Sequence, residues 1–291
     1  MEKIFKIKNS FGIDLDRTFD CGQCFRFDKV ENSEYDVEYR GVAYGRAVSF
    51  AEKDGELYVI GADDADFEKI WRRYLSLDED YGAIHGELLA LSENEALHRA
   101  VEYGRGIRIL RQEPWETVCS FIISQNNNIP RIKGLIKALS ERAGERLDDG
   151  VYSFPTAEAV AALGVQELRD LKMGFRAPYI IDAAEKVVRG ELDFEAVASL
   201  PTVEAEKMLC AVKGIGPKVA DCALLFGFSK YDAFPVDVWV KRVIEKYFDR
   251  SFEPSSLGKY AGVAQQVLFY YERWAPDSDN KTSSVSSVSV N

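Results

Sequence analysis

A glycine-rich bend between two apolar segments organises the C-terminal half of the chain: LCAVKGIGPKVADCALLF, from Leu209 to Phe226. Gly214 and Gly216 permit positive φ and a close approach of the backbone to a bulky group. Pro217 suits the first turn of the helix that follows. The unpaired N–H groups at such a helix start bind anions such as phosphate. An unliganded corner between two helices fits the same pattern equally well.

Lys218 lies one position inside this second helix and is followed by the largely apolar run VADCALLF. An amine held against an apolar wall beside a helix N-terminus favours its neutral form, which is a nucleophile. Downstream, in AFPVDVWVKR, Asp237 can cap the next helix. A carboxylate beside an amine suits chemistry that passes through a cationic sugar. A surface lysine and a plain helix cap explain the same two residues without chemistry.

The spacing of hydrophobic residues changes near residue 62, from the alternation typical of strands to the period typical of helices. Upstream, KIFKIKN, QCFRFDKV and YDVEYRGVAYGRAVSFAEKDGELYVIG alternate as strands do, and KDG marks a hairpin. Downstream, the segments between residues 63 and 275 have a helical period and are separated by Gly, Pro and Asn. We predict an α+β fold, with an N-terminal antiparallel β-sheet domain at 1–98 that includes a helix near 63–76, a mostly α-helical helix–hairpin–helix domain at 99–275, and a disordered Ser-rich tail at 276–291.

The composition excludes several classes of protein. The 291 residues carry a net charge of −11, which argues against nucleic acid unless basic residues gather on one face. Such a face is predicted from the basic residues Arg105, Arg108, Arg111, Arg131, Lys133, Lys137, Lys207, Lys213, Lys218, Lys230, Lys241 and Arg242. No run is long enough to span a membrane and no apolar leader is evident, so we expect an intracellular protein, cytoplasmic in a prokaryote.

The cysteine pattern offers little support for a metal site. Cys21 and Cys24 form the single C-x-x-C among five cysteines, and the chain has only two histidines. A structural zinc site or an iron–sulfur cluster needs more ligands than this. We therefore expect ordinary thiols on a strand, no metal and no cofactor.

Four separated motifs, taken together, resemble a known family. VKGIGPKVADCALLF followed by PVDVWV resembles the helix–hairpin–helix and aspartate signature of base-excision DNA glycosylases. RILRQEPWETVCSFIISQNNNIPRIKGLIKAL, CGQCFRF and KMGFRAPYI resemble three DNA- and lesion-contacting segments of 8-oxoguanine DNA glycosylase/AP lyases. The likeness covers nearly all of residues 1–275, in the family's order.

The resemblance implies a bifunctional enzyme that acts on double-stranded DNA containing oxidised guanine, as a monomer. Lys218 would attack C1′ of a flipped 8-oxoguanine nucleoside opposite cytosine, and Asp237 would be its catalytic carboxylate. The resulting Schiff base would permit β-elimination and strand nicking. Gly214 and Gly216 would present the hairpin to a DNA phosphate.

The resemblance also assigns a lesion pocket. Gly22 would offer its carbonyl to the N7–H that 8-oxoguanine has and guanine lacks. Phe269 and Cys222 would sandwich the base, and Gln265 would read its Watson–Crick edge. Without the resemblance, core packing would explain Phe269.

A second group of residues would face the rest of the duplex. Asn126 would fill the gap left by the flipped base, while Arg131 and Arg176 would bind the orphaned cytosine. Phe175 would be a wedge without the hydroxyl of the tyrosine that many relatives have. Trp239 stands where relatives often have histidine, and its indole donates a single N–H.

Two other functions remain open at this point. One is a glycosylase of the same superfamily for oxidised pyrimidines or alkylated purines, against which the cysteine count and Lys218 argue. The other is a non-catalytic DNA-binding protein that uses the hairpin only as a phosphate clamp, against which the presence of both Lys218 and Asp237 argues.

Overall fold

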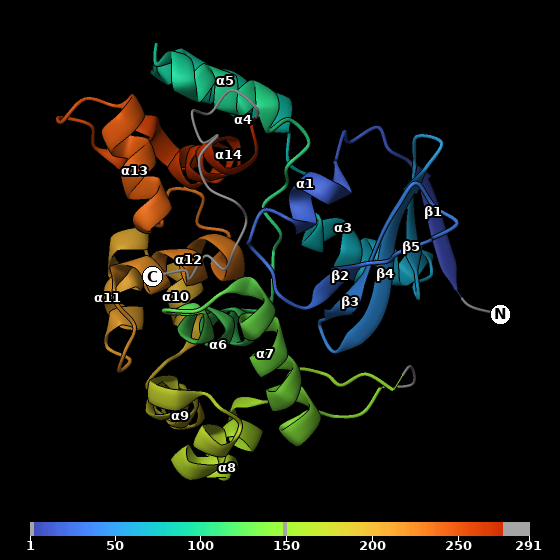
Figure 1. Cartoon of the computed structure of the whole chain (residues 1–291), viewed down its shortest axis with the longest axis vertical. Helices are drawn as coiled ribbons and strands as arrows, with labels where there is room; N and C mark the ends of the chain where they lie inside the picture. Colours follow the sequence, from blue (N-terminus) through green and yellow to red (C-terminus); the bar gives the residue numbers. More distant parts are fainter. Residues whose placement is uncertain (1–2, 148–149, 276–291) are drawn as a thin grey trace.

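The computed structural model describes residues 3–147 and 150–275. The predicted tail at 276–291 lies outside the described residues. Figure 1 shows the strands gathered on one side of the molecule and the helices from α4 onward on the other, which confirms the predicted α+β class.

The N-terminal part is a five-stranded antiparallel sheet of order β1-β5-β4-β3-β2. Its strands are β1 (Ile4–Lys8), β2 (Phe27–Lys29), β3 (Val37–Ala43), β4 (Arg46–Lys53) and β5 (Glu56–Ile60). Two-residue turns with positive φ at Tyr44–Gly45 and Asp54–Gly55 join β3 to β4 and β4 to β5. The second of these is the hairpin predicted from KDG, since such turns match the twist of the flanking strands.

One face of the sheet is covered by a continuous helical segment. It consists of α2 (Asp64–Asp66), the π-helix η1 (Phe67–Trp71) and α3 (Arg72–Tyr74). Asp63 caps its start with a capping box. Phe67 and Trp71 are fully buried, and Trp71 packs edge-on against Phe50 of β4 with ring centroids 5.5 Å apart. The sheet and this segment share one apolar core.

The first 62 residues are less regular than predicted. A short helix, α1 (Leu15–Phe19), capped by Asp14, interrupts the strands. The expected strand QCFRFDKV is reduced to β2, so residues 21–26 form a loop and Cys21 and Cys24 are buried loop residues, not strand residues. Burial raises the pKa of the Cys21 thiol to about 12, so this thiol stays protonated and inert at neutral pH.

The remaining helices form a second body with its own apolar core. They are α4 (Tyr81–Leu91), α5 (Glu95–Tyr103), α6 (Pro114–Ser124), α7 (Ile129–Ala143), α8 (Ala157–Asp170), η2 (Gly174–Arg176), α9 (Ala177–Val188), α10 (Phe194–Ser199), α11 (Thr202–Cys210), α12 (Pro217–Phe228), α13 (Val238–Tyr247), η3 (Pro254–Tyr260) and α14 (Ala261–Trp274). The proposed boundary near residue 98 falls within α5, whose buried side chains belong to this helical core.

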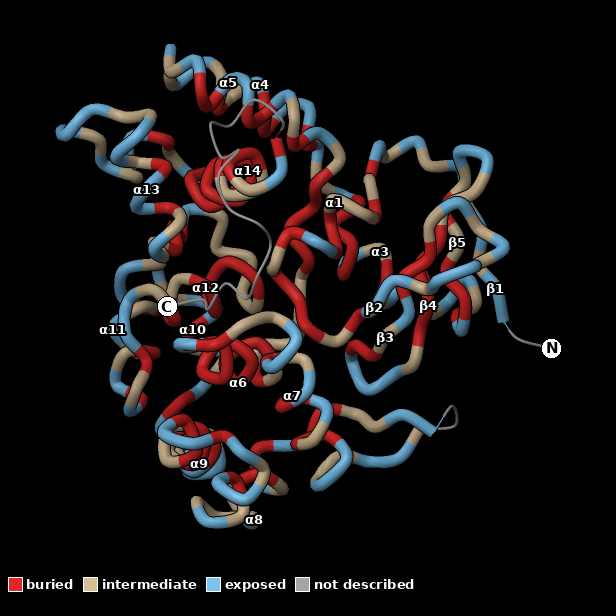
Figure 2. Tube along the Cα trace, in the orientation of Figure 1, coloured by how far each residue is buried: buried red, intermediate tan, exposed pale blue. Residues whose placement is uncertain are grey.

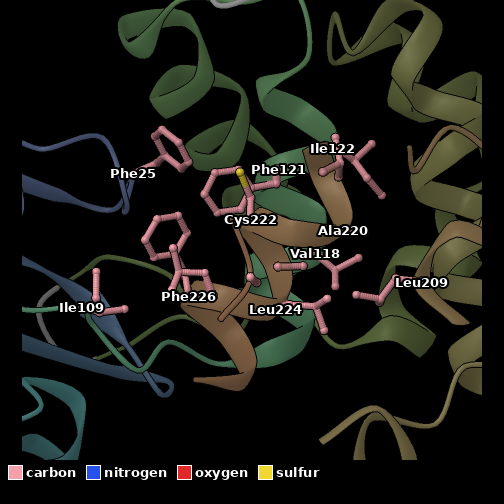
Figure 3. Close-up of a cluster of buried hydrophobic side chains, with 14 of the residues drawn as sticks. Phe25, Ile109, Val118, Phe121, Ile122, Leu209, Ala220, Cys222, Leu224 and Phe226 are labelled. Atoms are coloured by element: carbon pink, nitrogen blue, oxygen red, sulfur yellow. The ribbon is translucent and has the colours of Figure 1, made fainter. Parts of the chain in front are cut away.

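Helices α6, α12 and α14 are the most deeply placed elements of the helical body, as the buried segments in Figure 2 show. Phe121 of α6 stacks on Phe226 of α12, with centroids 5.5 Å apart and ring planes at 17°. Phe25, from the N-terminal part, meets Phe121 edge-on at 5.6 Å. Figure 3 shows these rings beside Cys222. An aromatic cluster thus joins the two parts of the chain.

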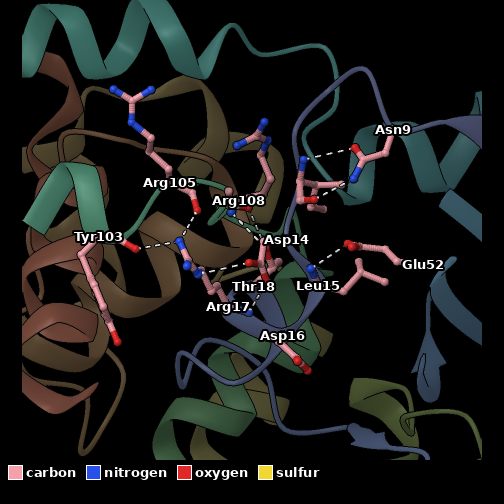
Figure 4. A network of polar contacts seen from close by, with 12 residues as sticks. Asn9, Asp14, Leu15, Asp16, Arg17, Thr18, Glu52, Tyr103, Arg105 and Arg108 are labelled. Atoms are coloured by element: carbon pink, nitrogen blue, oxygen red, sulfur yellow. Dashed lines mark hydrogen bonds and ion pairs between the residues drawn. The ribbon is translucent and has the colours of Figure 1, made fainter. Parts of the chain in front are cut away.

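A polar network anchors α1 to the end of α5 and to residues 104–113, which join α5 to α6 and which we call the linking segment (Figure 4). The Arg17 guanidinium donates to the carbonyl oxygens of Tyr103 and Arg105 at 2.8 and 2.9 Å. The Arg108 backbone N–H donates to Thr18 Oγ1 at 3.2 Å. Because α1 leads directly into residues 21–26, these bonds also fix where that loop lies.

Candidate active site

The predicted helix–hairpin–helix is present, formed by α11, a tight bend and α12. Gly214 has φ +80, and a Cβ on it would lie 2.2 Å from Cδ2 of Tyr179. Pro217 occupies the first turn of α12, as predicted. The expectation of positive φ at Gly216 is wrong: it adopts φ −101 as the N-cap, and a Cβ added there would meet open space. The requirement for glycine therefore lies at Gly214, where the backbone meets an aromatic ring.

Behind the hairpin lies a cavity of about 560 Å³. It is bounded by α12, α14, the start of α13, residues 124–132 and the loop at 21–25. The cavity brings together six predicted site residues from distant parts of the sequence: Gly22, Lys218, Cys222, Asp237, Gln265 and Phe269.

Lys218 reaches this cavity from the first turn of α12. Its Nζ lies 5.9 Å from the centre of the Phe121 ring. Within the part of the chain that the structure describes, its ammonium group has no ion pair or hydrogen bond. An amine half-buried against an aromatic wall and free of a carboxylate partner is available to react.

Asp237 caps α13, as the sequence predicted. Its Oδ1 accepts a hydrogen bond from the Val240 backbone N–H at 2.7 Å. The cap fixes the carboxylate at the cavity wall that Lys218 also lines. The cap and the proposed catalytic role are therefore compatible, because one carboxylate oxygen is enough for the cap.

Cys222 and Phe269 provide the apolar surfaces of the cavity, one on α12 and the other on α14. Burial raises the pKa of the Cys222 thiol to about 12, and nearby Lys218 opposes the rise. The thiol is therefore neutral at physiological pH and acts as a packing surface, since only a thiolate is a strong nucleophile.

Gln265 contributes an unsatisfied polar atom to this cavity. The residue is only 5% exposed, and its Oε1 has no hydrogen-bond partner among the described residues. Leaving a buried acceptor unpaired costs roughly 1–3 kcal/mol. A small rotation of the Gln265 side chain would let this acceptor bind a donor in the cavity that the residue lines.

The loop at residues 21–25, which we call the CGQC loop, is held by buried amides. Gln23 is fully buried; its Nε2 donates to the carbonyl oxygens of Thr18 and Arg108, and its Oε1 accepts from the Leu110 N–H at 2.8 Å. Gln266 donates to the Cys21 carbonyl at 2.8 Å. Gly22 has φ +80 and lies against Phe269.

The other predicted site residues lie outside the cavity. Asn126 is exposed with φ +48, in the segment at residues 125–128 that joins α6 to α7. We call this segment the wedge loop. Phe175 is 48% exposed and Arg131 is also exposed. Arg176, by contrast, is 3% exposed, and donates to the carbonyl oxygens of Gln125 and Asn126.

Six of the twelve basic residues predicted to form one face are engaged within the described part of the protein. Arg105 pairs with Glu102, Arg111 with Glu79, Lys133 with Asp28 and Lys137 with Glu141. Arg108 is buried over the Tyr81 ring, and Lys230 donates to two backbone carbonyls. The face was predicted because these basic residues are close together in the sequence. The sequence does not show which acidic side chains the fold brings next to them.

Some cations of the predicted set remain unpaired. Arg131, Lys218 and Lys241 have no carboxylate within ion-pair distance among residues 3–147 and 150–275. They lie on the first turn of α7, α12 and α13 respectively. Lys207, Lys213 and Arg242 likewise form no ion pair among the described residues, and of these six unpaired cations Lys218 alone lines the cavity.

Several cavity residues were not predicted. Phe121 and Arg273 line the cavity together with Trp239. Phe121 gave no signal, because it lies in a uniformly apolar helix. Gln266, which also lines the cavity, and Gln23, which holds the CGQC loop, did carry a signal. Each is an amide inside a run of buried residues, where a polar side chain needs a specific partner.

The described residues contain no group of three or more His, Cys, Asp or Glu that could hold a metal ion. A search of the same residues found no helix with the length and hydropathy that a membrane span requires.

Comparison with known proteins accounts for both parts of the chain. Residues 4–118 match the family model of the 8-oxoguanine DNA glycosylase N-terminal domain, and residues 119–254 match the HhH-GPD superfamily of base excision DNA repair proteins. Among curated proteins, the N-glycosylase/DNA lyase of Saccharomyces cerevisiae is 34% identical over 58% of this chain. That match spans 57% of the yeast protein.

Solved structures extend the likeness over nearly the whole chain. The 8-oxoguanine glycosylase/lyase of Clostridium acetobutylicum, in complex with double-stranded DNA containing cytosine opposite 8-oxoG, is 36% identical with a TM-score of 0.85. The match covers 94% of this chain and 97% of that one. MBOgg1 in complex with a low-affinity DNA ligand is 38% identical, with a TM-score of 0.85 and coverage of 94% and 98%. The chain therefore belongs to the 8-oxoguanine DNA glycosylase/lyase family.

Proposed function

We propose that this protein is a bifunctional DNA glycosylase/AP lyase that excises 8-oxoguanine from duplex DNA, preferentially opposite cytosine, and then nicks the strand. One observation carries the proposal. A single cavity holds an amine without an ion pair, a capped carboxylate, an orphaned buried amide oxygen and two apolar walls. The cavity volume of about 560 Å³ lies within the range of small-ligand sites.

The reaction begins when the damaged nucleotide leaves the base stack, since C1′ is inaccessible inside a duplex. The Lys218 amine attacks C1′, and the glycosidic bond breaks with its electron pair going to the base. Asp237 stabilises the positive charge that develops on the sugar. Loss of the amine proton and opening of the sugar ring give a Schiff base. Removal of a C2′ proton then expels the 3′ phosphate and nicks the strand.

The cavity also supports recognition of the lesion. The orphaned Oε1 of Gln265 would accept a hydrogen bond from the Watson–Crick edge of the base. Cys222 and Phe269 would cover its two faces. The Gly22 carbonyl would accept from N7–H of 8-oxoguanine; guanine presents a lone pair there, which leaves the carbonyl unpaired at a cost of about 1–3 kcal/mol.

The exposed residues outside the cavity would meet the duplex. Asn126 would enter the gap left by the extruded nucleotide, and Phe175 would wedge beside it. Arg131 and Arg176 would donate to the orphaned cytosine. The N–H groups of the hairpin at Gly214 and Gly216 would contact a phosphate, as helix starts do. Trp239 replaces a possible phosphate contact with apolar surface at the cavity wall.

Borohydride trapping tests the proposal directly. Duplexes with 8-oxoguanine opposite each of the four bases are incubated with protein and reductant, which fixes a Schiff base as a covalent adduct. The wild-type protein should give an adduct, most rapidly opposite cytosine. Lys218→Gln should release base at least about 1000-fold more slowly and give no adduct, because it removes the nucleophile.

Lys207→Gln is the matched control, because Lys207 is an exposed lysine on the neighbouring helix α11 and lines no part of the cavity. It should trap like the wild-type protein. An adduct that persists in Lys218→Gln would show that another amine is the nucleophile. Tight binding without base release by the wild-type protein would favour the non-catalytic clamp, and release of a different damaged base would favour another branch of the superfamily.

A further inference from the structure

Arg273 lines the cavity together with Lys218 and Asp237, and the proposed reaction does not use it. It lies in the last turn of α14 and is partly buried. Its guanidinium forms no hydrogen bond or ion pair among the described residues. It lies beside two aromatic rings, with Cζ 5.9 Å from the ring centre of Phe269 and 5.3 Å from that of Trp274. The donors of this cation are therefore available to a ligand.

One face of α14 runs from the floor of the cavity to its mouth. Gln265, Phe269 and Arg273 line the cavity at intervals of four residues, so successive side chains lie above one another along the helix. Gln265 is only 5% exposed, whereas Phe269 and Arg273 are partly exposed. Eight residues of helix span about 12 Å. A purine nucleotide with its Watson–Crick edge on Gln265 and its base on Phe269 would therefore extend its sugar and phosphates toward Arg273.

The chemistry of the position favours a phosphate. Arginine stays charged in proteins, and its planar donors match two phosphate oxygens with parallel hydrogen bonds. A phosphodiester is negatively charged, whereas the edges of 8-oxoguanine are neutral. The neighbouring walls at Phe269 and Trp239 are aromatic, so a charge-assisted bond there is less weakened by water than one on an open surface. Lys218, the other cation that lines the cavity among the described residues, is needed at C1′.

Asp20 is the carboxylate that would compete for Arg273. It ends α1 directly before the CGQC loop. Desolvation raises the pKa of the Asp20 carboxyl, and the charge of Arg273 is the largest effect that opposes the rise, so the two groups lie near each other. They nevertheless form no ion pair. Arg273 is thus left for an anion that the described part of the protein does not supply.

We propose that Arg273 binds one of the two phosphates of the extruded nucleotide, at the mouth of the cavity. The inference rests on the proposed function, which places the damaged base between this position and the cavity floor. The contact is separate from that of the hairpin, because Gly214 and Gly216 line no part of the cavity. Loss of Arg273 should weaken the binding of every extruded nucleotide, whatever its base, because the phosphate is common to all of them.

A double-mutant cycle between protein and DNA tests the contact. The probe is a duplex with a tetrahydrofuran abasic analogue opposite cytosine, which keeps both phosphates but has no base to release and forms no Schiff base. A methylphosphonate then replaces the phosphate on its 5′ side or on its 3′ side and removes the charge there. Arg273→Met should bind the unmodified probe about tenfold more weakly than the wild-type protein does.

The modified probes show whether the side chain and the phosphate act together. At one of the two positions, the methylphosphonate should weaken binding by the wild-type protein about tenfold and binding by Arg273→Met less than about twofold, because the contact is already lost. Arg273→Lys, which keeps the charge without the planar fork, should bind the unmodified probe with an intermediate affinity.

Arg242→Met is the matched control. Arg242 is exposed on α13, forms no ion pair among the described residues and lies over the Trp239 ring at 5.1 Å, but it does not line the cavity. Any loss of affinity in Arg242→Met should therefore add to the methylphosphonate effect at both positions, because the two act independently.

Three results would overturn the proposal. Additive effects of Arg273→Met and the methylphosphonate at both positions would exclude the phosphate contact. A loss in Arg273→Met confined to probes that carry 8-oxoguanine would assign Arg273 to the base edge. Equal losses in Asp20→Asn and Arg273→Met would assign the effect to that pair of side chains. If the wild-type protein released no 8-oxoguanine, the proposed function would fail, whereas the cycle on the abasic probe would still decide whether Arg273 binds phosphate.

Discussion

The hairpin at residues 212–217 and the CGQC loop at residues 21–25 flank the same cavity but are built in different ways. The bend of the hairpin is closed by short-range bonds: the Ile215 N–H donates to Val212, and the N–H groups of Val219 and Ala220 donate to Gly216. Its long-range contacts are to α9 alone, where the Lys213 N–H donates to Asp182 at 2.8 Å and Gly214 packs on Tyr179. The CGQC loop is held from far away in the sequence.

The partners of the CGQC loop lie in the linking segment and in the last helix. Gln23 bonds to Arg108 and Leu110, which are 85 and 87 residues away, and Gln266 reaches Cys21 across 245 residues. A site can therefore combine an element that its own sequence specifies with one that exists only after the rest of the chain has folded. Substitutions in the two regions should therefore lower stability and activity for different physical reasons.

The largest loss of stability is expected from Gly214→Ala. The added Cβ would lie 2.2 and 2.3 Å from Cδ2 and Cγ of Tyr179, and the residue would keep φ +80. The clash involves the base of the ring, which cannot swing away without moving the side chain. Strain and overpacking together should lower the free energy of unfolding by about 3–5 kcal/mol and base release at least 100-fold. Chemical denaturation and single-turnover kinetics measure the two effects.

Gly216→Ala is the matched control in the same hairpin. Gly216 has φ −101, and nothing lies within 4 Å of the position that an added Cβ would take. Its stability should change by less than about 1 kcal/mol. Equal losses in the two variants would show that close packing on Tyr179 does not set the hairpin.

The same contrast explains what the sequence could predict. The β4–β5 hairpin, the bend before α12, the proline in the first turn of α12 and the Asp237 cap all follow from residues within one or two turns of each other. Helix α1 was missed because five residues are too few to show a helical period. QCFRFDKV is adjacent to the alternating strands in sequence, but the backbone carbonyls of Cys21 and Gln23 accept from the side chains of Gln266 and Gln112 instead of from a neighbouring strand.

The candidate site residues also fall into two groups, those suggested by the local sequence and those that the local sequence does not suggest. Lys218 and Asp237 are suggested by local pattern alone, whereas Gly22, Gln265 and Phe269 enter only through the family resemblance. Their local sequence is that of ordinary loop and core residues, and only the fold places them on one cavity. The engagement of Arg176 by the wedge loop has no trace in the sequence near it, because carbonyl groups occur at every residue.

A smaller effect, confined to the CGQC loop, is expected from Gln23→Leu. The substitution leaves the carbonyls of Thr18 and Arg108 without their amide donor and the Leu110 N–H without its acceptor. Because the site is fully buried, the free energy of unfolding should fall by about 3 kcal/mol. Urea denaturation measures this change, and KM for the lesion should rise as the loop loosens.

Gln166→Leu is the corresponding control in the helical body. Gln166 is exposed and makes a single bond, to Asp170 at 3.0 Å. Its free energy of unfolding should stay within about 0.5 kcal/mol of wild type. A comparable loss in Gln166→Leu would mean that the substitution itself, rather than burial, causes the effect in Gln23→Leu.

A change in stability smaller than that of Gln23→Leu is expected from Gly22→Ala, paired with Gly12→Ala. Both glycines have positive φ, +80 and +65, so each substitution should cost about 1 kcal/mol from backbone strain alone. The surroundings differ: nothing lies within 4 Å of a Cβ at Gly12, whereas a Cβ at Gly22 would be 3.8 Å from Cε1 of Phe269.

That distance is an ordinary contact in the empty cavity, but it takes up space beside the ring on which the base would stack. Gly22→Ala should therefore raise KM for 8-oxoguanine duplexes about tenfold, whereas Gly12→Ala should leave KM unchanged. Thermal melts of the two proteins measure the backbone strain. Steady-state kinetics measure the effect on KM of the methyl group in the cavity. An equal rise in KM in both would mean that loosening of the N-terminal region, and not the methyl group in the cavity, weakens binding. A rise in Gly22→Ala alone would place the backbone of the CGQC loop against the base itself.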